Sequence, residues 1–313
     1  MRLESKIYVA GHRGLAGSAI VRVLNDAGYF NLIKRCRDDL DLTDQQAVEN
    51  FFSTERPEYV FLAAAKVGGI LANQSWPAEY IRENLAIQTN VIHAAWRFGV
   101  KKLAFLGSSC IYPKHAGQPI REDSLLTGPL EPTNEWYAIA KIAGLKMCQA
   151  YRRQYGFDAI CLMPTNLYGP GDNFSLTESH VLPALIRKFH DAKCINSEKV
   201  KVWGTGRPRR EFLFSEDFGA AAVAMMARYS DESIVNIGTG DDIAISDLAE
   251  LVRGVVGFNG VVEYDLGKPD GTMLKRLDVS KAQLIGWSPK IHLADGIRRT
   301  YEWFLANLHL VRK

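Results

Sequence analysis

One stretch decides the fold: Lys6-Ile-Tyr-Val-Ala10 followed by Gly11-His-Arg-Gly14-Leu-Ala-Gly17. Its first five residues predict a short apolar strand, and apolar residues then recur at helical spacing over positions 15–27. Three glycines between a strand and a helix let the backbone approach a pyrophosphate, and the helix N-terminus offers that anion free N–H groups. The stretch therefore predicts a dinucleotide site, and a plain tight turn is the alternative.

Strands and helices alternate outward from this turn. We expect strands at 32–34, 59–63, 102–106 and 159–163, separated by helices at 44–54, 77–98 and 135–155. This alternation predicts an α/β fold, a Rossmann-type doubly wound parallel sheet with helices on both faces. After Pro164 the pattern becomes irregular, which indicates a smaller mixed α/β substrate lobe. We expect the dinucleotide-binding domain at 1–165 with a returning segment 213–238, and the lobe at 166–212 and 239–313.

Composition narrows the classes of partner. The 313 residues include 38 basic and 35 acidic side chains, a net charge of +3, and no run of like charges, so a nucleic acid partner is not expected. No apolar run approaches the roughly 18 residues of a membrane span. Five cysteines, an odd number without a Cys-x-x-Cys pair, favour reduced thiols, a cytoplasmic setting and no structural metal.

The residues at the end of the second predicted strand indicate whether the dinucleotide is NAD or NADP. An acidic residue there favours NAD, whereas the 2′-phosphate of NADP needs a cation. The segment reads Lys34-Arg-Cys-Arg-Asp38, so we expect Arg37, helped by Arg13 of the glycine turn, to hold the phosphate of NADP. Asp38 and Asp39 leave NAD open as the alternative.

A Tyr-x-x-x-Lys pair carries the candidate chemistry. Tyr137 and Lys141 lie four residues apart in a predicted helix and so share one face of it. A lysine cation nearby favours the phenolate, which predicts a tyrosine pKa closer to neutral. Such a pair also occurs by chance on helix surfaces, but Ser108 directly follows a predicted strand, where it can hydrogen-bond a substrate carbonyl. Together these residues predict an oxidoreductase site.

Several long strings carry a family resemblance: Val9-Ala-Gly-His-Arg-Gly14, Ala63-Ala-Ala-Lys-Val-Gly-Gly-Ile70, Gly107-Ser-Ser-Cys-Ile-Tyr-Pro113, Glu131-Pro-Thr-Asn-Glu135, Tyr137-Ala-Ile-Ala-Lys-Ile-Ala-Gly144, Pro164-Thr-Asn-Leu-Tyr-Gly-Pro170 and Lys268-Pro-Asp-Gly-Thr272. Through them the chain resembles the extended short-chain dehydrogenase/reductases, and among these the GDP-L-fucose synthase branch, also called GDP-4-keto-6-deoxymannose epimerase/reductases. The resemblance implies inversion of C3 and C5 of a GDP-linked keto sugar, reduction of C4 with NADPH, and a homodimer joined through the helices at 77–98 and 135–155.

The resemblance also implies residue roles. Cys110 and His180 match the family's base and acid for epimerisation, although a buried small residue and a polar residue at a helix start are the ordinary interpretations. Substrate contacts fall on Lys188, Trp203, Arg210 and Asp270, with lysine at position 188 where the family is expected to have arginine. Cofactor contacts fall on Gly11, His12, Arg13, Gly14, Leu15, Ala16, Gly17, Arg37, Asp38, Asp39, Leu40, Asp41, Leu42, Leu106, Gly107, Ser108, Ser109, Lys141, Pro164, Thr165, Asn166, Leu167 and His180.

Three other functions are alternatives to this one. A sugar-nucleotide dehydratase would need an acidic residue after the fourth strand, and Ser108-Ser-Cys-Ile-Tyr112 has none. A relative that makes GDP-colitose or a GDP-heptose could keep both Cys110 and His180. A non-catalytic NADP-sensing protein would have no need for the proton donor Tyr137.

Overall fold

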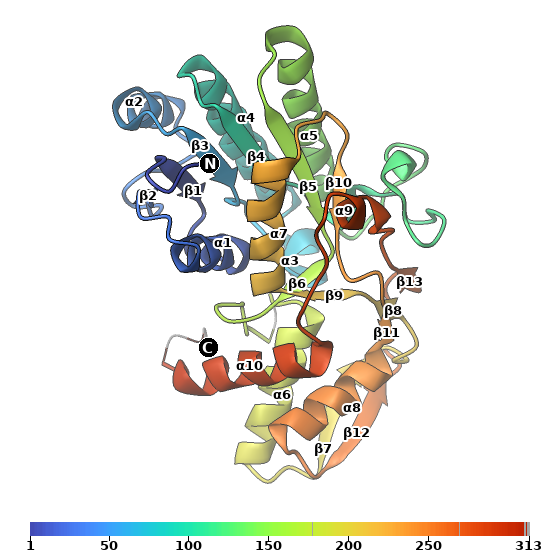
Figure 1. Ribbon diagram of the computed structural model, residues 1–313. Helices are drawn as coiled ribbons and strands as arrows, with labels where there is room; N and C mark the ends of the chain where they lie inside the picture. Colours follow the sequence, from blue (N-terminus) through green and yellow to red (C-terminus); the bar gives the residue numbers. More distant parts are fainter. Residues whose placement is uncertain (177, 269, 310, 312–313) are drawn as a thin grey trace.

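The computed structural model describes residues 1–176, 178–268, 270–309 and 311. Its centre is a six-stranded sheet in the order β10-β5-β4-β3-β1-β2, with every neighbouring pair parallel (Figure 1). The strands are β1 (Ile7–Ala10), β2 (Leu32–Ile33), β3 (Tyr59–Leu62), β4 (Lys102–Leu106), β5 (Ala159–Pro164) and β10 (Val235–Ile237). The first five coincide with the predicted strands to within one residue at each end. Strand order reverses at β1, so the carboxyl ends of β1 and β3 mark the expected ligand crevice.

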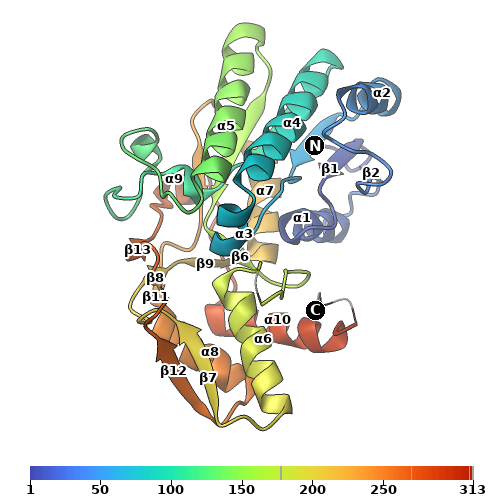
Figure 2. The same cartoon turned by 180° about the vertical axis from the view of Figure 1, so that it is seen from behind.

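Helices cover both faces of this sheet (Figures 1 and 2). On one face lie α1 (Leu15–Asp26) and α7 (Ser215–Arg228), and on the other lie α2 (Gln45–Glu55), α4 (Pro77–Arg97) and α5 (Glu135–Tyr155). Successive side chains of β1 point to opposite faces of the sheet, so this strand contributes to the hydrophobic core on each face. Ile7 and Val9 are buried under α1, and Tyr8 and Ala10 are buried on the opposite face. The predicted doubly wound sheet is confirmed.

A smaller lobe sits below the sheet in Figure 1. It combines α6 (Val181–Cys194), α8 (Ile245–Val256) and α10 (Leu293–Ala306) with the parallel pair β7 (Lys199–Trp203) and β12 (Val261–Asp265). A three-stranded sheet, β11 (Ile243–Ala244), β8 (Arg209–Arg210) and β13 (Leu274–Lys275), and the pair β6 (Asn166–Tyr168) and β9 (Phe212–Phe214) join it to the sheet domain. Apolar residues of the three helices and of β6, β7 and β9 form its separate core.

One segment of the C-terminal part returns to the large sheet. Helix α9 (Ser280–Leu284) packs beside β10, and its Ala282 is fully buried together with Trp287 against the α1 and α7 side. Leu277 and Val279 enter the core on the opposite side of the sheet. Positions 277–287 were expected in the lobe, but they pack with the sheet domain.

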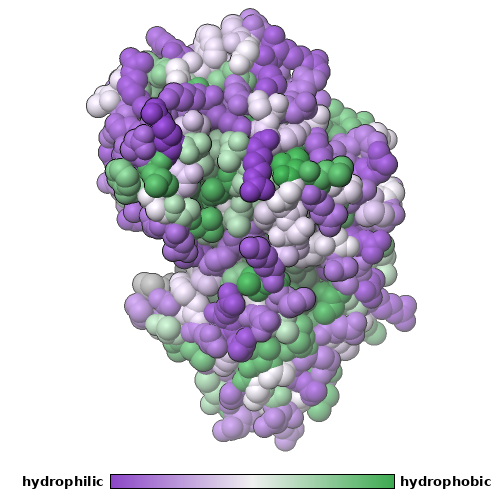
Figure 3. Space-filling model, in the orientation of Figure 1, coloured by the Kyte–Doolittle hydropathy of each residue, from purple (hydrophilic) through white to green (hydrophobic). Residues whose placement is uncertain are grey.

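The surface in Figure 3 intersperses hydrophobic and hydrophilic residues and narrows between the sheet domain and the lobe. Within the described ranges, no helix combines the length and the apolar character needed to cross a membrane.

Candidate active site

The glycine turn forms a close-packed cradle between β1 and α1. Gly11 has φ of +81°, and a Cβ there would lie 2.7 Å from the backbone nitrogen of Ala64 after β3. A Cβ on Gly17 would overlap the carbonyl oxygen of Gly11. The α1 N-cap, Gly14, offers no side-chain cap, so the first N–H groups of the helix stay available to an anion. The backbone therefore offers the close approach and free N–H groups that a pyrophosphate needs, and the site stays a prediction.

The loop after β2 carries both cations and carboxylates. Arg13 and Arg37 are exposed, and the Arg37 guanidinium lies 3.6 Å from the carboxylate of Glu83 on α4. Asp39 accepts hydrogen bonds from the backbone and thiol of Cys36, and these bonds lower its pKa. Both charge types that bear on the choice between NADP and NAD are thus present at this edge.

The remaining predicted cofactor residues of this edge divide into accessible and buried side chains. Leu40 and Leu42 are buried in the core, and Asp38 is exposed. Asp41 accepts hydrogen bonds from the backbone and hydroxyl of Thr43, which lower its pKa. His12 has a buried ring nitrogen, Nδ1, with no hydrogen-bond partner, and burial lowers its pKa.

Tyr137 and Lys141 are buried at the start of α5, beside the end of β4. The Lys141 ammonium donates a 2.7 Å hydrogen bond to the Leu106 carbonyl and lies 5.8 Å from the centre of the Tyr137 ring. Ser108 caps the short 3-10 turn Ser109–Ile111, and its hydroxyl interacts with that of Tyr137, which partly offsets the rise in the Tyr137 pKa. The three predicted residues therefore meet at the carboxyl edge of the sheet.

The expected lowering of the Tyr137 pKa is wrong for the protein in this state. Burial raises the pKa of the Tyr137 hydroxyl above its usual value, and burial lowers the pKa of Lys141 to about 8. Desolvation disfavours the charged form of each group and is the largest cause of both shifts. Tyr137 is therefore protonated at neutral pH and is poised to donate a proton.

The Cys110 sulfur faces two nitrogen donors from distant parts of the chain. Asn134 Nδ2 lies 3.3 Å from Cys110 Sγ, and the ammonium of Lys275 on β13 lies 3.8 Å from it. Cys110 also packs against Tyr137, within a small cluster that includes Ala72 and Tyr80. A thiol in these surroundings can exchange protons with a group placed next to Tyr137.

His180 is the N-cap residue of α6 and is exposed at its side chain, although protein atoms surround it at longer range. Desolvation is the main cause that lowers its pKa, and the charge of Lys275 lowers it further. Lys275 thus acts electrostatically on His180 and contacts Cys110, which links the two residues that the family resemblance paired.

The segments after β4 and β5 complete the sheet edge. Gly107 and Ser109 are buried, and a Cβ on Gly107 would overlap Met163. At the end of β5, Thr165 and Asn166 donate side-chain hydrogen bonds of 3.3 and 2.7 Å to the Glu211 carbonyl. Predicted cofactor positions Leu106, Pro164 and Leu167 lie on these same strands or on β6.

Four predicted substrate residues lie in or beside the lobe. Lys188 and Lys268 place their ammonium groups 5.2 and 5.3 Å from the ring centre of Trp203, which is half exposed. The Asp270 carboxylate accepts hydrogen bonds of 2.8 and 2.7 Å from the backbone and hydroxyl of Thr205. Arg210 donates to the Thr272 carbonyl, and the charges of Glu131 and Cys110 act on it, which places it near the reactive sulfur.

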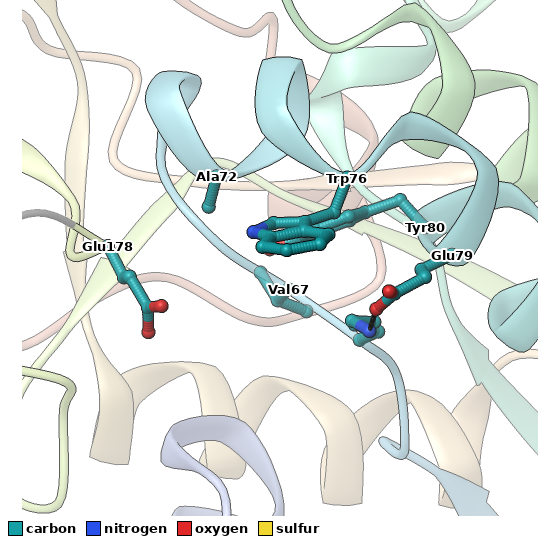
Figure 4. Close-up of a pocket in the computed structure, with 7 residues that line it drawn as sticks. Val67, Ala72, Trp76, Glu79, Tyr80 and Glu178 are labelled. Atoms are coloured by element: carbon teal, nitrogen blue, oxygen red, sulfur yellow. Dashed lines mark hydrogen bonds and ion pairs between the residues drawn. The ribbon is translucent and has the colours of Figure 1, made fainter.

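A pocket of about 390 Å³ opens beside the start of α4 (Figure 4). Trp76 and Tyr80 of α4's N-terminal end and Val67 line it, and the Glu178 carboxylate faces them from the loop before α6. Lys66 forms ion pairs with Glu79 and with Glu83, the second at 2.8 Å. Tyr80 belongs both to this pocket and to the cluster around Tyr137, so the pocket borders the site.

Lys275 and Asn134 are the site residues that sequence reasoning missed. Asn134 stands in a string that carried the resemblance, but nothing assigned it a function. Lys275 belongs to a two-residue strand that gives no periodic signal. In the described part of the chain, no three His, Cys, Asp or Glu side chains gather in a way that could hold a metal ion.

Comparisons with known proteins agree with this architecture. The model of the NAD dependent epimerase/dehydratase family matches residues 7–238. The chain is 61% identical over 305 residues to GDP-L-fucose synthase 1 of Arabidopsis thaliana, which covers 97% of this chain and 94% of the relative. It is 51% identical over 313 residues to GDP-L-fucose synthase of Escherichia coli (strain K12), with 97% and 98% covered.

Two solved structures share the whole fold. One is a GDP-6-OMe-4-keto-L-xylo-heptose reductase from C. jejuni, with a TM-score of 0.93, 40% identity, and 98% and 99% of the two chains covered. The other is a GDP-L-fucose synthetase from Naegleria fowleri bound to NADP, with a TM-score of 0.92, 28% identity, and 100% and 98% covered. With the family model spanning the glycine turn, the Tyr-Lys pair and all six strands of the sheet, the chain belongs to the NAD dependent epimerase/dehydratase family.

Proposed function

We propose that this protein converts GDP-4-keto-6-deoxy-D-mannose to GDP-L-fucose, by epimerisation at C3 and C5 followed by NADPH-dependent reduction at C4. One observation carries the proposal: a thiol, Cys110, lies beside the Ser108, Tyr137 and Lys141 set of a reductase, and Lys275 connects that thiol to His180. A reductase alone needs no such second proton-transfer pair. The identity of 61% and 51% to relatives named GDP-L-fucose synthase supports the substrate.

The dinucleotide fits the edge of the sheet domain. The Gly11 to Gly17 cradle would hold its pyrophosphate, and Arg13 and Arg37 would pair with a 2′-phosphate, which favours NADP as in the Naegleria fowleri relative. When bound, NADPH supplies the hydride for C4. The lobe side, with Lys188, Trp203, Arg210 and Asp270, would hold the GDP-sugar. We propose this division between residues 1–165 with 213–238 and the remainder of the chain.

Epimerisation requires a base and an acid on opposite faces of the sugar. Cys110 as thiolate removes the proton from the carbon next to the C4 ketone, and the electron pair moves into an enolate. Ser108 and Tyr137 donate hydrogen bonds to the C4 oxygen where the negative charge develops. His180 then returns a proton to the carbon from the other face. The same residues act at C3 and at C5.

Reduction uses the same contacts on the C4 oxygen. Tyr137, protonated because burial raises its pKa, donates its proton to that oxygen as C4 becomes an alcohol. The Lys141 ammonium, 5.8 Å from the centre of the ring, then stabilises the resulting phenolate. One set of contacts on the C4 oxygen can therefore serve both steps.

A GDP-keto-heptose is the second candidate substrate. The heptose reductase from C. jejuni matches the fold with a TM-score of 0.93, but its identity of 40% lies below the 61% and 51% of the two GDP-L-fucose synthases. A GDP-colitose product and a non-catalytic NADP sensor are weaker alternatives, the latter because the proton donor and its serine partner are intact.

We further propose a homodimer in the cytoplasm. Helices α4 and α5 lie side by side at the back of the molecule (Figure 2), and Trp136 and Tyr155 of α5 are nearly half exposed. Such aromatic exposure suits an interface with a second copy. Each of the five cysteines is free, which suits a reducing compartment. Light scattering at micromolar concentration that gave a mass near 34.9 kDa would contradict the dimer.

The function is tested by supplying NADPH with either GDP-4-keto-6-deoxy-D-mannose or a GDP-4-keto-heptose. We expect loss of NADPH absorbance with the hexose and identification of GDP-L-fucose by NMR. Faster turnover of the heptose would transfer the proposal to that substrate. Absence of turnover with both, despite tight NADPH binding, would support a sensor.

A further inference from the structure

The surroundings of Lys275 single it out among the basic residues of the site. Its ammonium lies 3.8 Å from Cys110 Sγ, 165 residues away in sequence. None of the described carboxylates comes within ion-pair distance of it, whereas Arg209 and Arg276 nearby both pair with Asp242. The half-buried Lys275 ammonium therefore directs its positive charge at the Cys110 sulfur.

The backbone around Lys275 is held firmly. The β13 strand pairs in parallel with β8. The backbone N–H of Arg276 donates to the Gln118 side chain, and the Arg276 carbonyl accepts from the backbone N–H of Ile120. Leu277 N donates a 2.7 Å hydrogen bond to the buried Glu211 carboxylate. Glu211 also accepts from the backbone of Thr239 and Gly240, which ties β13 to the end of β10. The ammonium is therefore positioned by the join between lobe and sheet domain.

We propose that Lys275 is a positioning residue for epimerisation, which together with Asn134 holds the Cys110 sulfur as a thiolate ready to remove the sugar proton. This inference rests on the proposed function for its substrate. Asn134 supplies the second donor, 3.3 Å from the sulfur, and its own Oδ1 is buried with no partner, so the amide is oriented by the sulfur. Two N–H donors on one sulfur stabilise negative charge there.

The same ammonium acts on the partner acid. Lys275 adds to desolvation in lowering the pKa of His180, so its charge acts on this residue as well as on the thiol. By contrast, the charges that act on Tyr137 and Lys141 come from Cys110, Tyr80 and Cys148. The groups on which Lys275 acts are thus the two that we assign to epimerisation. Loss of its charge should impair the two partial reactions unequally.

Lys275→Met keeps the length of the side chain and removes its charge, and Lys275→Arg restores the charge. Lys199→Met serves as the matched control, because Lys199 is an exposed lysine of the same lobe that pairs with Glu263 at the surface. The first readout is the alkylation rate of Cys110 by iodoacetamide, followed by peptide mass spectrometry without any substrate. The exposed Cys194 provides an internal reference in each sample.

We expect Cys110 to be alkylated about tenfold more slowly in Lys275→Met, and near the wild-type rate in Lys275→Arg and Lys199→Met, with Cys194 unchanged throughout. Cys110 alkylation at the wild-type rate in Lys275→Met would overturn the proposal. This readout needs no sugar, so it stands even if GDP-4-keto-6-deoxy-D-mannose is the wrong substrate.

The second readout separates the partial reactions in heavy water. With Lys275→Met, deuterium incorporation into the keto sugar without NADPH should fall by about tenfold or more, while tight binding of NADPH stays as in wild type. Equal incorporation by Lys275→Met and wild type would also overturn the proposal. A wild-type protein that incorporates no deuterium, with Lys275-dependent alkylation intact, would instead contradict the proposed substrate.

Discussion

Replacement of Lys141 by methionine should separate activity from stability. The Lys141 ammonium lies 5.8 Å from the centre of the Tyr137 ring, and we use this distance for its attraction to the phenolate that forms once the tyrosine has donated its proton. With an effective dielectric constant of about 20, the attraction at that distance is about 3 kcal/mol. That corresponds to about a hundredfold loss in the rate of C4 reduction.

The same substitution should leave the fold intact. Because burial lowers the pKa of Lys141 from 10.5 to about 8, keeping its ammonium charged at pH 7 costs the folded state about 3 kcal/mol. Methionine removes that cost but leaves the Leu106 carbonyl without its donor, an opposing loss of about 1 to 3 kcal/mol. We expect the midpoint of thermal unfolding to equal or exceed that of wild type.

The charge state of Lys141 predicts the direction in which the reduction rate changes with pH. The ammonium is lost as pH rises through about 8, so the wild-type rate of NADPH oxidation should fall on that alkaline limb, whereas the limb should be absent in Lys141→Met. Wild-type stability should rise over the range from pH 8 towards 10.5, because the folded state favours neutral lysine. A methionine variant that reduces substrate at the wild-type rate, or one that unfolds, would refute this reasoning.

Three further predictions concern the cofactor, the substrate and a buried carboxyl. Gly17→Ala should abolish NADPH binding in calorimetry, because its Cβ would overlap the Gly11 carbonyl. The control Gly254→Ala, which has open space around its Cβ, should bind NADPH normally and unfold at an equal or higher temperature. Normal binding by both variants would count against the cradle. Arg210→Lys should raise KM for the GDP-sugar about tenfold or more with little change in kcat, and an unchanged KM would remove Arg210 from the nucleotide site. Burial raises the pKa of Asp172 to about 7, so the free energy of unfolding should fall as pH rises from 4 to 7 and Asp172→Asn should abolish this fall; identical pH profiles in chemical denaturation would exclude the effect.

Local pattern was enough for the sheet domain. The strand at 6–10 and the glycine turn predicted a helix and a parallel sheet, since tight backbone approach and helical periodicity are encoded within about 20 residues. Strand β10 was not predicted as a strand, because three residues are too few to show alternation. The two-residue strands β8, β11 and β13 escaped prediction for the same reason.

The site was predictable where a motif contained its own partners. Tyr137 and Lys141 share a helix face, so spacing alone indicated their proximity. Spacing could not indicate that burial dominates both of their pKa values, because desolvation depends on the whole fold. Nor could it place Lys275 beside Cys110, since that contact depends on the pairing of β13 with β8 and on the Glu211 carboxylate beneath it.

The central claim is that one site both epimerises and reduces its sugar. The most direct measurement follows the conversion of GDP-4-keto-6-deoxy-D-mannose with NADPH in heavy water, and locates deuterium in the product by NMR for wild type, Cys110→Ser and His180→Gln. We predict GDP-L-fucose labelled at C3 and C5 from wild type, and loss of label and inversion in both variants, with NADPH still bound. Oxidation of NADPH by the wild-type protein without any label at C3 or C5 would contradict the account.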